Sequence, residues 1–220
     1  MEQYSVFDII GPRMTGPSSS HTAGAVRLAH VVKHIVGKKI TEARITLYGS
    51  FAETGKGHGT DKALIAGLLG LFPDDPRIKR AYDLAKEQGL VVLFAYSDEP
   101  VPHPNTARIH AVCTDNESTE VVGQSIGGGK IRITEINGLA VELSGDFPTI
   151  IVRHHDEPGV IADVSRVLAQ LKINIAFMRV FRHGKGEDAY MSIETDSPVT
   201  LEMQDVIRTL CPSIQQLYTV

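Results

Sequence analysis

Hydrophobic and polar residues alternate along the first part of the chain with two periods, one typical of helices and one typical of strands. The helical period begins after His21–Thr22, where Ala25, Leu28, Val32 and Ile35 fall on one face. In chain order the pattern predicts a helix over 22–38, a strand over 41–48, a helix over 60–71, a polar helix over 76–88 ended by Gly89, a buried strand over 91–96, and strands over 108–114, 119–125 and 130–136. This order predicts a mixed α/β domain over residues 1–145.

A second pattern follows the short hydrophilic link Leu143–Pro148. Ser197 and Pro198 supply an N-cap and a first helical residue for its second helix. The predicted elements are a strand over 149–153, a helix over 158–171, strands over 173–181 and 188–194, a helix to about residue 210, and a strand over 214–218. The order βαββαβ is the ferredoxin-like arrangement. The expected fold class is therefore α+β, with a ferredoxin-like domain over residues 148–220.

Composition and charge exclude several classes of protein. The formal net charge is −4 at pH 7, and no block of like charges is present, so neither nucleic acid nor a membrane surface is an expected partner. No apolar run approaches the roughly 18 residues that span a bilayer. The opening MEQYSVFDII lacks the basic and apolar regions of a secretory signal, which favours a cytoplasmic protein.

The two cysteines, Cys113 and Cys211, lie far apart and have no neighbouring histidine at metal-ligand spacing. We expect both to be buried as small apolar residues, and we expect no metal site in this chain. An iron–sulfur cluster is held by several thiolates, which this chain alone does not provide.

Three polar clusters stand out in the first domain. The first is the turn Gly16–Thr22, in which Ser18, Ser19, Ser20 and Thr22 surround His21 just before a helix. Hydroxyls and exposed amides at that place suit a carboxylate or another small anion. The alternative is an ordinary helix cap, which needs only one hydroxyl.

The second cluster is the glycine-rich stretch Thr54–Asp61, in which we interpret Gly55–Gly59 as a loop directly before the predicted helix. It is not a P-loop, because the lysine precedes the closing glycine and no Ser or Thr follows directly. Alternate glycines let a ligand approach the backbone near Lys56 and Gly57, and His58 stands between two of them. An ordinary histidine pKa near 6.5 suits proton transfer at neutral pH. The alternative is a flexible turn with a solvated histidine.

The third cluster, His103–Thr106, is held by prolines and exposes the amide of Asn105. Gly127–Gly129 is interpreted as a hairpin turn between strands rather than a ligand contact.

The second domain resembles the ACT domain of amino-acid-regulated enzymes, on the turn His154–Val160 and on Asn174 at the start of its second strand. The resemblance implies that an amino acid binds at an interface between such domains. The residues carried over are His154, Asp156, Gly159, Val160 and Asn174. Amides at a helix N-terminus attract a carboxylate. The alternatives are that this turn only starts a helix and that the domain serves only for self-association.

Together, the segment Ser5–Gly24, the GKGHGTD stretch and the HPNT turn, followed by an ACT domain, resemble the β subunit of iron–sulfur-dependent L-serine dehydratases over essentially the whole chain. Single-chain serine dehydratases usually have glycine after HPN, so Thr106 favours the two-subunit form. The first domain also resembles the allosteric substrate-binding domain of some phosphoglycerate dehydrogenases, which keeps a purely regulatory, serine-sensing function open.

The resemblance implies that L-serine loses its α-proton and β-hydroxyl and becomes pyruvate and ammonia. A [4Fe-4S] cluster, expected on a partner α subunit and not on this chain, would accept the hydroxyl as a Lewis acid. We expect His58 to be the base, with His21 second. The residues expected to hold serine are Ser18, Ser19, Ser20, Thr22, Lys56, Gly57 and Asn105. A pyridoxal-phosphate mechanism is disfavoured, because no lysine lies in a Schiff-base context. Self-association through the ACT domains is also expected.

Overall fold

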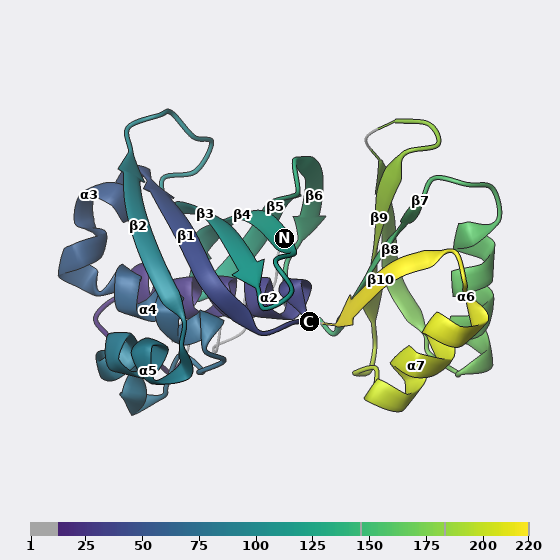
Figure 1. Ribbon diagram of the computed structural model, residues 1–220, viewed down its shortest axis with the longest axis horizontal. Helices are drawn as coiled ribbons and strands as arrows, with labels where there is room; N and C mark the ends of the chain where they lie inside the picture. The colour runs from purple at the N-terminus through teal and green to yellow at the C-terminus, as the bar shows by residue number, and fades with distance from the viewer. Residues whose placement is uncertain (1–12, 146, 183, 220) are drawn as a thin grey trace, which may run out of the picture. The chain divides into compact units, whose positions relative to one another are not determined.

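A computed structural model describes residues 13–145, 147–182 and 184–219 (Figure 1). The chain divides into two compact units, residues 1–138 and 139–220. The sequence instead suggested a boundary near residues 145–148, so the exact domain limits stay a prediction. The first eight residues of the motif that begins at Ser5 lie outside the described residues.

The first sheet is covered by helices, and its last strand, β6, begins directly after the boundary at residue 138. The strands run in the order β2-β1-β3-β4-β5-β6, with β1 parallel to β2 and antiparallel to β3. Helices α2, α4 and α5 gather on one side of this sheet (Figure 1). The elements are η1 (Ser19–Gly24), α2 (Ala25–Val36), β1 (Ile40–Tyr48), α3 (Gly49–His58), α4 (Thr60–Leu68), η2 (Pro76–Arg80), α5 (Ala81–Gln88), β2 (Val91–Ser97), β3 (Thr106–Cys113), β4 (Ser118–Gly127), β5 (Lys130–Ile136) and β6 (Leu139–Leu143).

Helices α2 and α4 can approach closely at Gly67, because this residue has no side chain. A Cβ added at Gly67 would lie 2.3 Å from the Val26 carbonyl oxygen and 2.7 Å from Cβ of Ala29. The apolar face of α2 predicted from its spacing is buried, and the helix ends at Gly37 with a φ of 66°. Since η1 leads directly into α2 and α3 is followed by α4, the packing of α2 against α4 positions both η1 and α3.

The start of the first helical segment differs from the prediction. Helical structure begins at Ser19, as the π-helix η1, rather than at His21–Thr22. The reason is the cap: Oγ of Ser18 accepts a hydrogen bond of 3.0 Å from the His21 amide.

The interpretation of Gly55–Gly59 as a loop was wrong for all but its last residue, and the helix predicted to start at Thr60 does start there. Residues 49–58 form α3, and α4 starts two residues later. Gly59, with a φ of 70°, ends α3 in the left-handed conformation, where its N–H meets the carbonyls of Gly55 and Lys56. Among the alternate glycines, Gly59 therefore breaks the helix, while Gly55 and Gly57 lie within it.

Two strand predictions also need correction. Strand β2 was expected to be buried, but it is an edge strand, and Val91 and Leu93 are 55% and 51% exposed. Strand β6 was not predicted at all. It follows a two-residue turn in which Asn137 and Gly138 have φ values of 49° and 78°, a combination that joins antiparallel strands.

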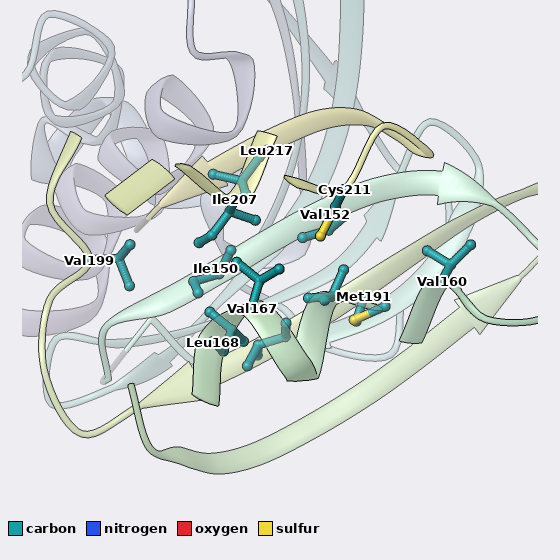
Figure 2. Packing of buried hydrophobic residues seen from close by; sticks show 12 residues of the cluster. Ile150, Val152, Val160, Val167, Leu168, Met191, Val199, Ile207, Cys211 and Leu217 are labelled. Atoms are coloured by element: carbon teal, nitrogen blue, oxygen red, sulfur yellow. The ribbon is translucent and has the colours of Figure 1, made fainter. Parts of the chain in front are cut away.

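The second unit has the predicted ferredoxin-like order of elements. Its sheet has the strand order β10-β7-β9-β8, with every described pairing antiparallel. Figure 2 shows the core between this sheet and its two helices, with Ile150 and Val152 of β7 facing Val167 and Leu168 of α6. The elements are β7 (Thr149–His155), α6 (Val160–Gln170), β8 (Ile175–Arg182), β9 (Asp188–Thr195), α7 (Leu201–Leu210) and β10 (Ile214–Thr219). The predicted fold class is confirmed.

Candidate functional site

The π-helix η1 lies against α3 through the side chain of His21. Nε2 of His21 lies 3.1 Å from Oγ1 of Thr54 and 3.2 Å from Oγ of Ser50. The imidazole also makes an edge contact with the ring of Phe51 at a centroid distance of 5.2 Å. The first and second predicted clusters therefore meet at His21.

Hydrogen bonds assign the protonation of His21. The Thr54 hydroxyl donates to the carbonyl oxygen of Ser50 at 2.9 Å, so it can only accept from His21. Nε2 of His21 therefore carries a hydrogen. Burial lowers the pKa of His21 below its usual value, and the neighbouring His58 lowers it further, although the Ser50 carbonyl opposes both effects. A neutral imidazole with its hydrogen on Nε2 follows.

His58 lies on the last turn of α3, with its ring centroid 4.9 Å from that of His21. Its Nδ1 lies 3.0 Å from the carbonyl oxygen of Thr54, one helical turn earlier. Since a carbonyl only accepts, Nδ1 carries the hydrogen, and the lone pair of a neutral ring is on Nε2. His58 can therefore accept a proton at Nε2 without first losing one.

The third cluster is joined to the first by Ser125, a residue that the sequence analysis did not single out. Oγ of Ser125 donates to the carbonyl oxygen of Ser20 at 2.9 Å. Its amide donates to the Asn105 carbonyl at 2.9 Å, and its own carbonyl accepts from Nδ2 of Asn105 at 3.3 Å. Ser125 is fully buried and packs on Gly24, where an added Cβ would lie 2.0 Å from its Oγ. No sequence signal separated it from its strand neighbours.

The third cluster also contacts the start of α3. The carbonyl oxygen of Pro104 accepts a hydrogen bond of 3.3 Å from the Phe51 amide, and Gly49, with a φ of 50°, leaves room for Pro104. Oδ1 of Asn105 and Oγ1 of Thr60 are buried with no hydrogen-bond partner in the described part of the chain. A buried polar group without a partner costs about 1–3 kcal/mol.

The remaining predicted residues take different places. Ser18, Ser19 and Ser20 are half-buried around the start of η1. Thr22 is buried, and its hydroxyl donates to the His58 carbonyl at 3.3 Å, so it holds η1 to the end of α3. Lys56 extends over the ring of Tyr96, with Nζ 5.3 Å from the centroid, and thus lies on another face of α3 than His58. The structure does not bring Lys56 to the two histidines.

Gly57 is exposed on the last turn of α3, beside His58. A Cβ added there would meet nothing within 4 Å. Packing within the described chain therefore does not require glycine at this position.

The thiols of this chain do not fit an iron–sulfur cluster. Cys113 and Cys211 are both buried, in different units, and burial raises the pKa of each thiol. Among residues 13–145, 147–182 and 184–219, no group of three or more His, Cys, Asp or Glu side chains could hold a metal ion. A cluster needs several thiolates at one place.

In the second unit, the predicted effector residues lie in two places. Gly159, with a φ of 101°, precedes α6, and Val160 is its first, buried residue. Asp156 accepts a hydrogen bond of 2.8 Å from Arg182, which lowers the pKa of the Asp156 carboxyl below its usual value. Nδ1 of His154 lies 2.6 Å from the His155 carbonyl, and its Nε2 is buried with no partner among the described residues.

Asn174 lies at the opposite end of the same sheet. It directly precedes β8, whose first residue Ile175 pairs with Thr195, whereas His155 pairs with Asp188 at the far end of β9. The side-chain amide of Asn174 donates a hydrogen bond of 2.7 Å to the carboxylate of Asp196. One ACT unit therefore does not bring Asn174 to His154 and Asp156.

Within the described residues, no helix is both long enough and apolar enough to cross a bilayer.

Comparisons with known proteins agree with both motif resemblances. The profile of the serine dehydratase beta chain family matches residues 5–88, and that of the ACT domain matches residues 148–212. A probable L-serine dehydratase beta chain of Bacillus subtilis is 46% identical over 99% of this chain and 98% of its own length. The chain belongs to the family of L-serine dehydratase beta chains.

Another member of this beta-chain family, from Peptoniphilus asaccharolyticus, is 40% identical over 94% of each chain. A D-3-phosphoglycerate dehydrogenase of Synechocystis is 26% identical over 89% of this chain but only 35% of its own length. The resemblance to the beta chains is confirmed. The second likeness is weaker, and it agrees with the expected similarity to a domain of such dehydrogenases.

Proposed function

We propose that this chain acts with a cluster-bearing α subunit to convert L-serine to pyruvate and ammonia. Both similar beta chains carry L-serine dehydratase in their names. The observation that carries the proposal is the meeting of three separate polar clusters around His21, His58 and Ser125. A ligand among them would be surrounded by hydroxyls, amides and two imidazoles.

His58 is the proposed base. Its Nε2 carries the lone pair because Nδ1 is held by the Thr54 carbonyl, whereas Nε2 of His21 is a donor to Thr54. In this proposal Nε2 of His58 takes the α-proton of serine, and the electron pair left on Cα forms the double bond to Cβ while the bond from Cβ to the hydroxyl oxygen breaks. The departing hydroxide would be taken up by the Lewis-acidic iron that the partner's cluster would supply, and aminoacrylate would result. Aminoacrylate then tautomerises and is hydrolysed to pyruvate and ammonia. His21, kept neutral by burial, does not repel the protonated His58.

The three serines of the first cluster are the proposed carboxylate ligands, supported by their half-buried position around the start of η1. Asn105 differs from them, because its Nδ2 is already donated to Ser125. Its Oδ1, which has no partner in the described part of the chain, is left to accept from the ammonium group of serine. Thr22, Lys56 and Gly57 remain weaker proposals, since Thr22 and Lys56 have other contacts.

The [4Fe-4S] cluster is proposed on the partner, because two separated, buried thiols cannot hold it here. The chain alone is therefore expected to be inactive. We also propose that the assembled enzyme is cytoplasmic, which cell fractionation would test.

The test is anaerobic co-expression with a cysteine-rich α subunit, followed by measurement of pyruvate formed from L-serine. His58→Ala should lower kcat by about 10²- to 10⁴-fold, as expected for loss of a general base. Glu53→Gln, an exposed change on the same helix, is the matched control. Assembled His58→Ala enzyme with near-normal turnover would rule out His58. Absence of pyruvate from a cluster-loaded complex that still binds serine would favour the purely sensing function.

For the ACT unit we propose an effector site shared between two copies, in which the second copy supplies Asn174. This is supported by the distance of Asn174 from Asp156 along the sheet and by the unpartnered Nε2 of His154. Sedimentation of the chain with each amino acid in turn, alongside an Asn174→Ala variant, tests it. An effector that binds a strictly monomeric chain would contradict the shared site.

A further inference from the structure

We propose that His30 and His34, on helix α2, bind a divalent transition metal ion, Cu²⁺ or Ni²⁺. The two residues are separated by one helical turn, and their Nε2 atoms lie 3.0 Å apart, joined by a hydrogen bond from one imidazole to the other. This site is independent of the proposed dehydratase chemistry. It also differs from our expectation that the chain has no metal site.

The separation of the two nitrogens matches two neighbouring ligands of one ion. Imidazole nitrogens bind such metals at about 2.0–2.1 Å, so two of them at a right angle lie about 3.0 Å apart. At a tetrahedral angle the same bonds would separate the nitrogens by about 3.4 Å. At this separation both nitrogens can bind one ion in place of the hydrogen bond between them. Cu²⁺ stands highest in the affinity order for nitrogen ligands, and both Cu²⁺ and Ni²⁺ accept imidazole ligands at right angles.

The surroundings of His30 orient its ring for this role. Its Nδ1 faces the carbonyl oxygen of Leu71 at 3.4 Å, which assigns the hydrogen to Nδ1 and the lone pair to Nε2. Metal-binding histidines commonly donate their other nitrogen to a carbonyl in this way. The ring also lies beside that of Phe72, at a centroid distance of 5.0 Å.

The site is accessible to an ion, and the helix that carries it is anchored in the core. His34 is exposed, whereas Val31, Val32 and Ile35 on the same helix are buried in the core. The backbone that carries both ligands is thus fixed before an ion binds. Water fills the other coordination positions, since the described residues contain no group of three suitable ligands.

The charge of Lys33, which lies between the two ligands in sequence, acts on both imidazoles. This charge repels a cation, so the affinity depends on Lys33 as well as on the two ligands.

The other histidine pair of this unit is a poorer chelate. The ring centroids of His21 and His58 lie 4.9 Å apart, close to the 4.8 Å between those of His30 and His34. Nε2 of His21, however, is held by hydroxyls of Ser50 and Thr54. A metal there would have to displace bonds to two hydroxyls, whereas at His30 and His34 it displaces the single bond between the two rings.

The experiment is titration of the tag-free full-length chain with CuCl₂, NiCl₂ and ZnCl₂ by calorimetry, with electron paramagnetic resonance of the Cu²⁺ sample. We expect one high-affinity Cu²⁺ per chain, an order Cu²⁺ > Ni²⁺ > Zn²⁺, and hyperfine coupling from two nitrogens. His34→Gln should weaken binding by about tenfold or more and leave coupling from one nitrogen. Lys33→Gln should strengthen binding.

The matched control is His58→Gln, which should bind Cu²⁺ as the natural chain does. His34 is exposed, so its replacement should not disturb the fold, which circular dichroism would verify. The proposal is overturned if His34→Gln keeps the affinity of the natural chain, if His58→Gln is the variant that loses binding, or if only one nitrogen couples to Cu²⁺ in the natural chain.

Discussion

Replacing Gly57 with alanine tests whether glycine at this position serves the stability of the chain or the binding of substrate. The added methyl group would meet nothing within 4 Å, and φ at Gly57 lies outside the left-handed region. Alanine at such a position reduces the freedom of the unfolded chain and stabilises the fold by about 0.4–1 kcal/mol. For a chain of this size the increase in Tm is about 1–4 °C.

Thermal unfolding of the chain alone measures this gain. Gly89→Ala is the control, because its Cβ also meets nothing within 4 Å while its φ is 72°, so this variant should be less stable by about 1–2 kcal/mol. In the assembled enzyme, the Gly57 methyl beside His58 should raise KM for serine. A destabilised Gly57→Ala chain would contradict the helical placement of this residue. A stabilised variant with an unchanged KM would refute its contact with substrate.

Three further predictions concern the supports of the two sites. Gly24→Ala should lower the free energy of unfolding in urea by about 1–3 kcal/mol, because the added methyl group crowds Ser125. A second change, Ser125→Gly, should restore much of this loss. If the effects of the two changes simply add, the contact is refuted. Ser18→Ala should lower the free energy of unfolding by about 1 kcal/mol, because it removes the hydroxyl that caps η1. Ser18→Asp should keep most of the stability, because its carboxylate can accept the same hydrogen bond. Equal losses in both variants would contradict the cap. The hydrogen bond from Arg182 lowers the pKa of Asp156, so the pair stabilises the fold above the unfolded carboxyl pKa of about 3.9 and loses this contribution as pH falls through the folded value. Arg182→Gln should therefore be less stable than the natural chain at about pH 7, and the difference should shrink as the pH falls below about 3.9; a difference that stays constant into acid would oppose this.

Period and turn chemistry predicted most elements of both units. The spacing of Ala25, Leu28, Val32 and Ile35 gave α2, and the order of the last six elements gave the ferredoxin-like unit. The Asn137–Gly138 pair was an available signal for β6 that the sequence analysis did not use. The exposure of β2 was harder to predict, because an apolar run does not tell whether a strand lies at the edge or the centre of a sheet.

The contacts that join the clusters could not be predicted in the same way. Ser125 links Ser20 to Asn105 mostly through backbone atoms, and every residue type has those atoms. The sequence identified polar side chains before helices, but the contact between η1 and the third cluster depends on the close packing of Gly24 on Ser125. Such a contact joins residues far apart along the chain, and local pattern carries no information about it.

The correction of residues 55–58 from loop to helix strengthens the proposal for His58. In a solvated loop both ring nitrogens would exchange hydrogens with water, and nothing would hold the hydrogen on Nδ1. On the last turn of α3, the carbonyl of Thr54 lies one turn below the ring and holds the hydrogen on Nδ1. Thr22 then fixes the same turn by donating to the His58 carbonyl. In the proposed mechanism the helix therefore selects Nε2 of His58 as the nitrogen that accepts the proton, and Gly59 ends the helix directly after His58.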